Sequence, residues 1–257
     1  MIYFVVPAYD EAPNIERLFD QLRPVAEELD AHVFLVDDGS TDGTADLARR
    51  AGAGIELRII EHGENRGLGA ALDTGLRAVL EQASDDDVIV TAEGDGTSDL
   101  DDLPAMLSCL DEGRDVVLAS VHAPGGKLVG VAHWRVIASR SASAVVRLAA
   151  RLPDVHTVSA VYRCYRVAAL RRAAERYGDD LIREPGFAVN VELLLKLTSS
   201  GASVCEVPTT NDWTQRAGAS KLQTGKTLRA YARVLRAHRA ARQRLPELAP
   251  AAPVEPR

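Results

Sequence analysis

The chain has 257 residues, of which 46% are hydrophobic and 26% charged, a balance typical of a soluble globular protein of one α/β domain or two small ones. It excludes an intrinsically disordered chain, a collagen and a small disulfide scaffold. A chain of this length buries enough surface to fold without a metal ion or disulfides, so a bound metal would serve chemistry.

Short apolar runs alternate with helical patterns through the first half of the chain. The runs predicted as strands, most of them apolar on both faces, are 2–6, 33–36, 56–60, 88–91 and 115–119. The helices predicted between them are 14–29, 44–51, 69–82 and 103–110. This alternation predicts right-handed crossovers and a doubly wound, mostly parallel sheet with helices on both faces.

A basic helix is predicted near the C-terminus. Residues 221–244 contain two lysines, six arginines and no acidic side chain. Residues that recur at helical spacing in this stretch are Leu228, Tyr231, Val234, Leu235 and His238. Such a helix could lie on an anionic membrane surface or pack on the domain with its arginines in water, and the sequence leaves both open. The last residues, 245–257, are rich in Pro and Ala and are predicted to form a disordered tail.

The formal net charge of -7 hides an uneven distribution. Residues 1–112 carry 26 acidic and 7 basic side chains, whereas the rest of the chain carries 11 acidic and 23 basic ones. An acidic half beside a basic half suits a cation on one side and an anionic ligand on the other, or two solvated faces.

The cysteines and the apolar segments indicate the compartment. Cys109, Cys164 and Cys205 are far apart and form no C-x-x-C pair, so neither a disulfide framework nor a zinc site is expected. The sequence shows no signal peptide and no run of about 18 apolar residues that could cross a membrane. We therefore expect a cytoplasmic protein, with peripheral contact at the inner face of the membrane through 221–244 as one option.

Acidic loops follow three of the predicted strands, at 7–11, 37–42 and 93–97. Ligands of doubly wound sheets bind beyond the carboxyl ends of the strands, so we expect the three loops to converge on one edge. Helix capping and tight turns could explain part of this pattern, above all at 40–42.

Glu93 and Asp95 are two residues apart at a strand end. In an extended segment this spacing places both carboxylates on one face, where they can reach a single hard cation. Carboxylates that hold Mg²⁺ or Mn²⁺, with phosphate oxygens completing the shell, are the usual arrangement at a nucleotide-diphosphate site.

A series of motifs accompanies these loops in chain order. Residues 6–11 are similar to V-P-x-Y-N-E with Asp10 in place of Asn, 36–42 to V-D-D-G-S-x-D, and 65–71 to N-x-G-x-G-x-A. The later motifs are G-F-x-x-x-x-E at 186–192, E-V-P at 206–208, and R-x-x-G-x-S-K-L, one residue shorter, at 216–222. Together they resemble the family 2 glycosyltransferases of the GT-A fold, and within them the polyprenyl-phosphate (dolichyl-phosphate) mannosyl- and glucosyltransferases.

The resemblance implies a GT-A domain over 1–222, followed by the basic helix 223–244 and the tail 245–257. The positions it implies for binding a sugar nucleotide are Pro7, Ala8, Tyr9, Glu11, Asp37, Asp38, Glu93 and Asp95. It implies Glu93, Asp95 and Thr97 around Mg²⁺ or Mn²⁺ as cofactor, with Asp95, Arg216 and Lys221 in catalytic roles. The positions assigned to acceptor or leaving phosphate are Arg135, Arg140, Arg216, Ser220 and Lys221.

The implied reaction is metal-dependent, inverting transfer of a hexose, with mannose from GDP-mannose preferred to a UDP-sugar, onto a polyprenyl phosphate. A phosphate nucleophile is already ionised and needs no general base, whereas a hydroxyl acceptor would need one. The alternative is therefore a family 2 enzyme acting on a soluble hydroxyl-bearing acceptor in natural-product or cell-envelope assembly, with Asp154 or Glu192 as base. Departures from the family pattern at 119–122 and 159–162 lie on the acceptor side and favour this alternative somewhat.

A noncatalytic module that binds nucleic acid through the basic half is the remaining hypothesis. Only 5% of the residues are aromatic and no nucleic-acid recognition motif is present, so no nucleic acid partner is expected.

Overall fold

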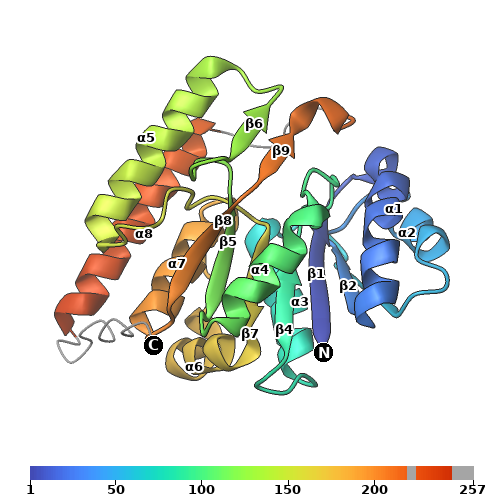
Figure 1. Ribbon diagram of the computed structural model, residues 1–257, viewed down its shortest axis with the longest axis horizontal. Helices are drawn as coiled ribbons and strands as arrows, with labels where there is room; N and C mark the ends of the chain where they lie inside the picture. Colours follow the sequence, from blue (N-terminus) through green and yellow to red (C-terminus); the bar gives the residue numbers. More distant parts are fainter. Residues whose placement is uncertain (219–223, 245–257) are drawn as a thin grey trace.

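A seven-stranded sheet forms the centre of the structure, a computed structural model that describes residues 1–218 and 224–244 (Figure 1). The strands are β1 (Ile2–Ala8), β2 (His32–Asp37), β3 (Leu57–Glu61), β4 (Val88–Thr91), β5 (Val116–Ser120), β7 (Arg163–Arg166) and β8 (Val204–Pro208). Their order is β3-β2-β1-β4-β7-β5-β8, and each neighbouring pair is parallel except the two that β7 makes, which are antiparallel. The predicted mostly parallel sheet is confirmed.

Helices cover both faces of this sheet. They are α1 (Ala12–Leu29), α2 (Thr44–Ala51), α3 (Leu68–Leu80), α4 (Leu103–Asp111), α6 (Val167–Tyr177) and α7 (Val189–Ser199). Alternate residues of β1 enter different cores: Tyr3 and Val5 pack with α3, α6 and α7, whereas Phe4 and Val6 pack with α1 and α4. Strands that are buried on both faces read as continuous apolar runs, as β1, β2 and β5 do. Each predicted strand and helix of the first half lies within two residues of its observed bounds.

Two further helices stand side by side at one edge of the molecule (Figure 1). They are α5 (His133–Ala150) and α8 (Thr224–Arg244). Next to them a small parallel sheet pairs β6 (Lys127–Val129) with β9 (Thr210–Asp212). The predicted basic C-terminal helix thus exists as α8. Within the described part of the chain, none of the helices has the length and apolar character needed to cross a bilayer. The predictions for Ser220, Lys221 and the tail 245–257 lie outside the described residues.

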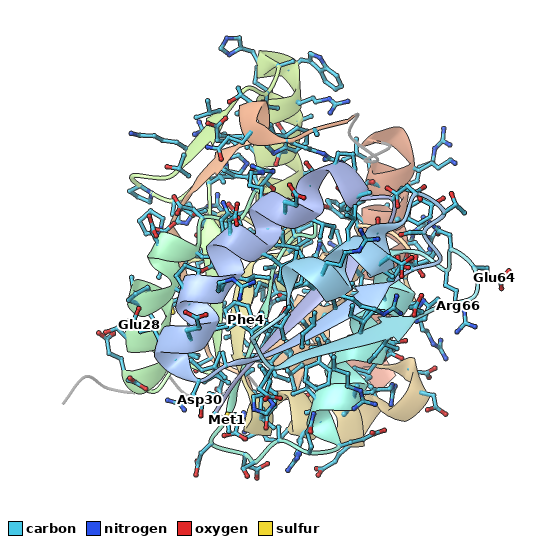
Figure 2. All side chains as sticks on the ribbon, turned by 90° about the vertical axis from the view of Figure 1, so that its right-hand side faces the viewer. Met1, Phe4, Glu28, Asp30, Glu64 and Arg66 are labelled. Carbon is cyan, nitrogen blue, oxygen red and sulfur yellow. The ribbon has the colours of Figure 1, made fainter. Side chains whose placement is uncertain are left out.

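The acidic side chains of the first half are largely solvated. Phe4 lies inside the molecule, whereas Glu28, Asp30 and Glu64 are exposed at its periphery (Figure 2). Most of the charge asymmetry is therefore a property of the surface, and the carboxylates that matter for a site are the few that are buried or half-buried.

Candidate active site

A cleft of about 1000 Å³ opens at the carboxyl ends of β1, β2, β4 and β5. Residues from all three acidic loops line it, namely Pro7, Ala8, Tyr9, Glu11, Asp38, Glu93, Gly94, Asp95 and Thr97. The predicted convergence of these loops on one edge of the sheet is confirmed.

The first two loops are bonded to each other. Asp10 N–H donates to Ser40 Oγ over 2.9 Å, and Thr41 N–H donates to Asp10 Oδ1 over 3.0 Å. Asp10 has a φ of 46°, a left-handed conformation that Asp and Asn tolerate better than most residues. This explains why Asp can stand where the resembling motif has Asn. Asp42 accepts from the Thr44 N–H at 3.0 Å and therefore organises the start of α2.

Asp38 is held rigidly at the floor of the cleft. Its Oδ1 accepts from the Arg66 N–H at 3.0 Å and its Oδ2 from the Gly67 N–H at 2.7 Å. Its Oδ1 also lies 2.7 Å from Nδ1 of buried His62, whose Nε2 lies 2.9 Å from Thr74 Oγ1. These contacts fix the Asp38 carboxylate before any ligand arrives. Sequence reasoning missed His62, since it belongs to none of the motifs.

Asp37, unlike Asp38, is held inside the protein and away from the cleft lining. It is buried, it contacts the Ser40 hydroxyl closely, and it is absent from the residues that line the cleft. Burial raises the pKa of its carboxyl group above the ordinary range. The predicted contact of Asp37 with a sugar nucleotide stays a prediction.

Glu93 and Asp95 bring two carboxylates together on the cleft wall. Thr97 Oγ1 donates to Asp95 Oδ1 over 2.7 Å, and the Ser98 hydroxyl donates to the Glu93 carboxylate. Burial, and then the Asp95 charge, raise the pKa of Glu93 to about 7. A buried pair of like charges is stabilised by a cation between them.

The donor atoms at this pair fit Mg²⁺ or Mn²⁺, because Glu93, Asp95 and Thr97 offer oxygen alone. Within 1–218 and 224–244, no group of three or more His, Cys, Asp and Glu side chains is arranged to hold a metal ion. A cation at Glu93 and Asp95 would therefore need ligand or water oxygens to complete its shell, as magnesium commonly does at phosphate sites.

Arg216 lies among these carboxylates. Its Nη1 is 3.1 Å from Asp95 Oδ2 and its Nη2 is 4.0 Å from Glu11 Oε1, and its side chain is 12% exposed. Glu11 Oε2 also accepts from Asn14 Nδ2 at 2.6 Å. A guanidinium from the basic half thus sits beside the acidic loops, where it can meet a phosphate oxygen.

The structure separates the other predicted acceptor residues. Arg135 lines the cleft, whereas Arg140 is exposed, does not line it, and places its Nε 3.5 Å from His122 Nδ1. Asp154 is exposed and also lies outside the cleft lining. Their predicted roles stay predictions.

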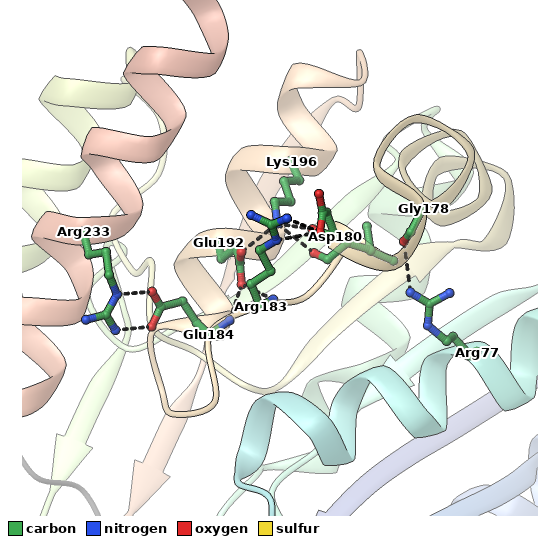
Figure 3. A network of polar contacts seen from close by, with 9 residues as sticks. Arg77, Gly178, Asp180, Arg183, Glu184, Glu192, Lys196 and Arg233 are labelled. Carbon is green, nitrogen blue, oxygen red and sulfur yellow. Dashed lines mark hydrogen bonds and ion pairs between the residues drawn. The ribbon is translucent and has the colours of Figure 1, made fainter.

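Glu192 forms part of the cleft's support (Figure 3). One of its oxygens accepts from the N–H groups of Arg183 at 2.9 Å and Glu184 at 2.8 Å, and the other meets Lys196 Nζ at 2.6 Å. Glu192 does not line the cleft. Its carboxylate is held by these three donors and thereby shapes the loop that precedes α7.

That loop ties α8 to the site. The nearly buried Glu184 accepts two bonds from Arg233 of α8, at 2.7 Å from Nε and 2.6 Å from Nη2 (Figure 3). α8 thereby becomes one wall of the cleft. The apolar side chains of the walls near α5 and α8 are Leu128, Val131, Ala138, Ala142, Leu228 and Tyr231.

A doubly wound sheet whose carboxyl edge carries a carboxylate pair and an arginine in one cleft defines the class as an α/β protein with a site suited to a nucleotide diphosphate. The family model described as glycosyl transferase family 2 matches residues 3–173, about two thirds of the chain, and the chain belongs to that family.

Two curated relatives extend the match. The chain is 31% identical over 240 residues to an undecaprenyl-phosphate mannosyltransferase of Micrococcus luteus, covering 93% of this chain and 94% of that one. It is 28% identical over 228 residues to a polyprenol monophosphomannose synthase of Mycolicibacterium smegmatis, covering 88% and 82%.

A solved structure shares the fold. It is glucosyl-3-phosphoglycerate synthase from Mycobacterium tuberculosis in complex with Mn²⁺, UDP-glucose and phosphoglyceric acid. Its TM-score is 0.65 at 20% identity, with 93% of this chain and 79% of that chain covered. The predicted GT-A fold is confirmed.

Proposed function

We propose that this glycosyltransferase moves mannose from GDP-mannose to a polyprenyl phosphate, with inversion at the sugar carbon and with Mg²⁺ or Mn²⁺ bound at Glu93 and Asp95. The observation that carries the proposal is a single cleft that joins this carboxylate pair to apolar walls from α5 and α8. The names of the two mannosyltransferase relatives support the choice of sugar and of acceptor.

The donor end is the better defined half of the proposal. Asp38, already oriented by Arg66, Gly67 and His62, offers carboxylate oxygen to the nucleoside. Asp95 and Glu93 would hold the cation, which would offset the charge that develops on the leaving diphosphate. Arg216, 3.1 Å from Asp95 Oδ2, would add a fixed positive charge beside the same oxygens.

The acceptor end favours a phosphate nucleophile over a hydroxyl. Neither predicted base lines the cleft: Asp154 is exposed, and the Glu192 carboxylate is occupied by Arg183, Glu184 and Lys196. A phosphate oxygen is ionised near neutral pH and attacks without a base. The apolar cleft walls would accept the first part of a prenyl chain.

The test is an assay of the purified chain with Mn²⁺, a panel of sugar nucleotides and a short polyprenyl phosphate. We expect release of GDP from GDP-mannose, formation of a mannosyl phospholipid, and loss of both with a chelator. Asp95→Asn should lower kcat/KM by about a hundredfold or more, whereas Asp20→Asn, an exposed carboxylate of α1, should change it little. Absence of nucleotide release with every donor would overturn the proposal.

The donor can be tested separately by thermal shift. GDP with Mn²⁺ should raise Tm more than UDP with Mn²⁺, and neither should do so after chelation, because a ligand stabilises the folded state that binds it. An equal shift with UDP would reject the preference for GDP-mannose.

A soluble hydroxyl acceptor is the second candidate, favoured by the departure at 119–122, which lacks the Arg that the family pattern has there. Asp154→Asn separates the two candidates. Loss of turnover with unchanged donor binding would support a hydroxyl acceptor, whereas full activity supports the phosphate. Cytoplasmic location, a catalytic domain over 1–222 and peripheral membrane contact through 221–244 belong to the same proposal.

A further inference from the structure

α5 carries a row of large apolar side chains that face solvent. Trp134, Ile137, Val145 and Leu148 are 58%, 65%, 61% and 83% exposed. Their spacing places them on one side of an α-helix, with Ser141 between the two pairs. Single exposed apolar residues need no explanation, whereas a contiguous row marks a surface that meets an apolar partner.

α8 extends this row sideways. A groove between the two helices is lined by Ala138, Ala142 and Val145 of α5 and by Leu228 and Leu235 of α8. Leu228 is itself 44% exposed. The two helices therefore present one apolar surface, which we call the α5–α8 face.

The charge around this face has a single sign. α5 and the residue after it carry Arg135, Arg140, Arg147 and Arg151, and the sequence of α8 carries seven more basic residues. Neither helix contains an Asp or Glu. An apolar strip with basic flanks is complementary to lipid chains beneath negatively charged headgroups.

We propose that the α5–α8 face docks on the surface of an anionic lipid bilayer, with the exposed row of α5 inserted at the headgroup boundary. The sequence prediction placed membrane contact in 221–244 alone. In the structure, Tyr231 and Val234 of α8 pack into the core, so α5 supplies most of the exposed apolar area.

Docking through the α5–α8 face would also bring the cleft close to a lipid acceptor. This one step rests on the proposed function. The groove and the cleft share Ala138, Ala142, Leu228 and Tyr231. An acceptor whose prenyl chain stays in the bilayer could thus reach the cleft along the α5–α8 face.

Vesicle sedimentation tests the docking. The full chain should bind vesicles of phosphatidylcholine with phosphatidylglycerol, bind phosphatidylcholine alone far less, and lose binding as salt rises. The double variant Ile137→Ser with Leu148→Ser should weaken binding more than about tenfold. Val129→Ser, an exposed apolar residue of β6, is the matched control and should bind like the parent.

Charge removal provides a second variant. Arg147→Gln and Arg151→Gln should each weaken binding to the anionic vesicles about fivefold. Arg50→Gln replaces an exposed arginine of α2, far from α5 and α8 in the sequence, and should change vesicle binding little. If Arg50→Gln weakened vesicle binding as much as Arg147→Gln and Arg151→Gln do, the assignment of the α5–α8 face would be overturned.

Tryptophan fluorescence reports insertion directly. The chain has two tryptophans, so Trp213→Phe leaves Trp134 as the reporter. Its emission should shift to shorter wavelength with anionic vesicles and be quenched by brominated lipid chains. An unchanged Trp134 emission with anionic vesicles would overturn the proposal. A dimer that forms without lipid and is lost in the Ile137/Leu148 double variant would instead assign the α5–α8 face to contact with a second copy of the chain. These vesicles contain no acceptor or donor, so a failure of the proposed reaction leaves the result unaffected.

Discussion

Gly69 sits where α3 approaches the loop before α7. Its N–H donates to the Pro185 carbonyl at 2.9 Å, and a Cβ at this position would lie 1.9 Å from the carbonyl oxygen of Glu184. Backbone cannot yield as a side chain can. The close approach holds the Glu184 loop over the cleft edge.

We therefore expect Gly69→Ala to destabilise the fold by about 1–3 kcal/mol through this overlap. Urea unfolding measures the change. Gly63→Ala is the control, since a Cβ there meets no atom within 4 Å. Equal stability of the two variants would show that the loop moves freely away from α3.

His122 makes folding sensitive to acid. Burial, and then the nearby Arg140 and His156 charges, lower the pKa of His122 to about 4 from about 6.5 in an unfolded chain. Between these values the unfolded state binds more protons, so this contribution to stability is present above pH of about 6.5 and lost as pH falls toward 4.

The expected result is that His122→Gln flattens the fall of Tm between about pH 6.5 and 4. Melting curves of both proteins across this interval measure it. Parallel curves would mean that His122 titrates normally in the folded protein.

Sequence reasoning identified some residues of the site and its support and missed others. Asp38, Glu93 and Asp95 were identifiable because each follows an apolar strand. His62 and Arg233 were not, because their partners lie 24 and 49 residues away and no local pattern records such a pairing.

At the scale of elements, α8 depends on Arg233 for its position against the cleft. The Glu184 side chain is 9% exposed, and Arg233 donates a hydrogen bond to each of its two carboxylate oxygens. Removing the guanidinium leaves a nearly buried carboxylate without that charge.

Arg233→Gln should thus increase amide hydrogen exchange in the first half of α8 and raise the KM for the acceptor more than it lowers kcat. Exchange mass spectrometry and steady-state kinetics measure the two effects. Arg236→Gln is the control, because the described bond of its side chain runs to Ala232 of its own helix. Unchanged exchange in Arg233→Gln would show that core packing alone fixes α8.

The elements of the first half were predicted from their apolar runs, whereas β7 and α5 in the second half were not. β7 has the sequence Arg163-Cys164-Tyr165-Arg166, and its fully buried Arg163 donates to the carbonyls of Ala160, Val158 and Asn190 at 2.7, 2.8 and 2.8 Å. Because these hydrogen bonds allow an arginine to lie in the core, the sequence of β7 does not look like that of a core strand. α5 escaped prediction for the opposite reason, since its apolar residues lie on its exposed as well as its buried side.

For the whole molecule, the opposed charges of the two halves meet in the cleft as well as in the pairs Arg171–Asp85 and Arg166–Asp111. Arg216 from the basic half lies within ion-pairing distance of Glu11 and Asp95 from the acidic half. The remaining asymmetry is divided between solvated carboxylates and the arginines of α5 and α8. The sequence could reveal the asymmetry, but the contact between its two parts required the fold.

The reversed direction of β7 has a consequence for how such enzymes diversify. Its first residue, Arg163, pairs with Thr91 and Leu118 near the ends of β4 and β5, so the chain re-enters the sheet at the edge from which it left after β5. The excursion between them, with β6 and α5, therefore begins and ends at neighbouring points. Segments with adjoining ends tolerate insertion, deletion and exchange. The segment with β6 and α5, which we propose faces the acceptor, can change while the strands that carry the three acidic loops keep their register.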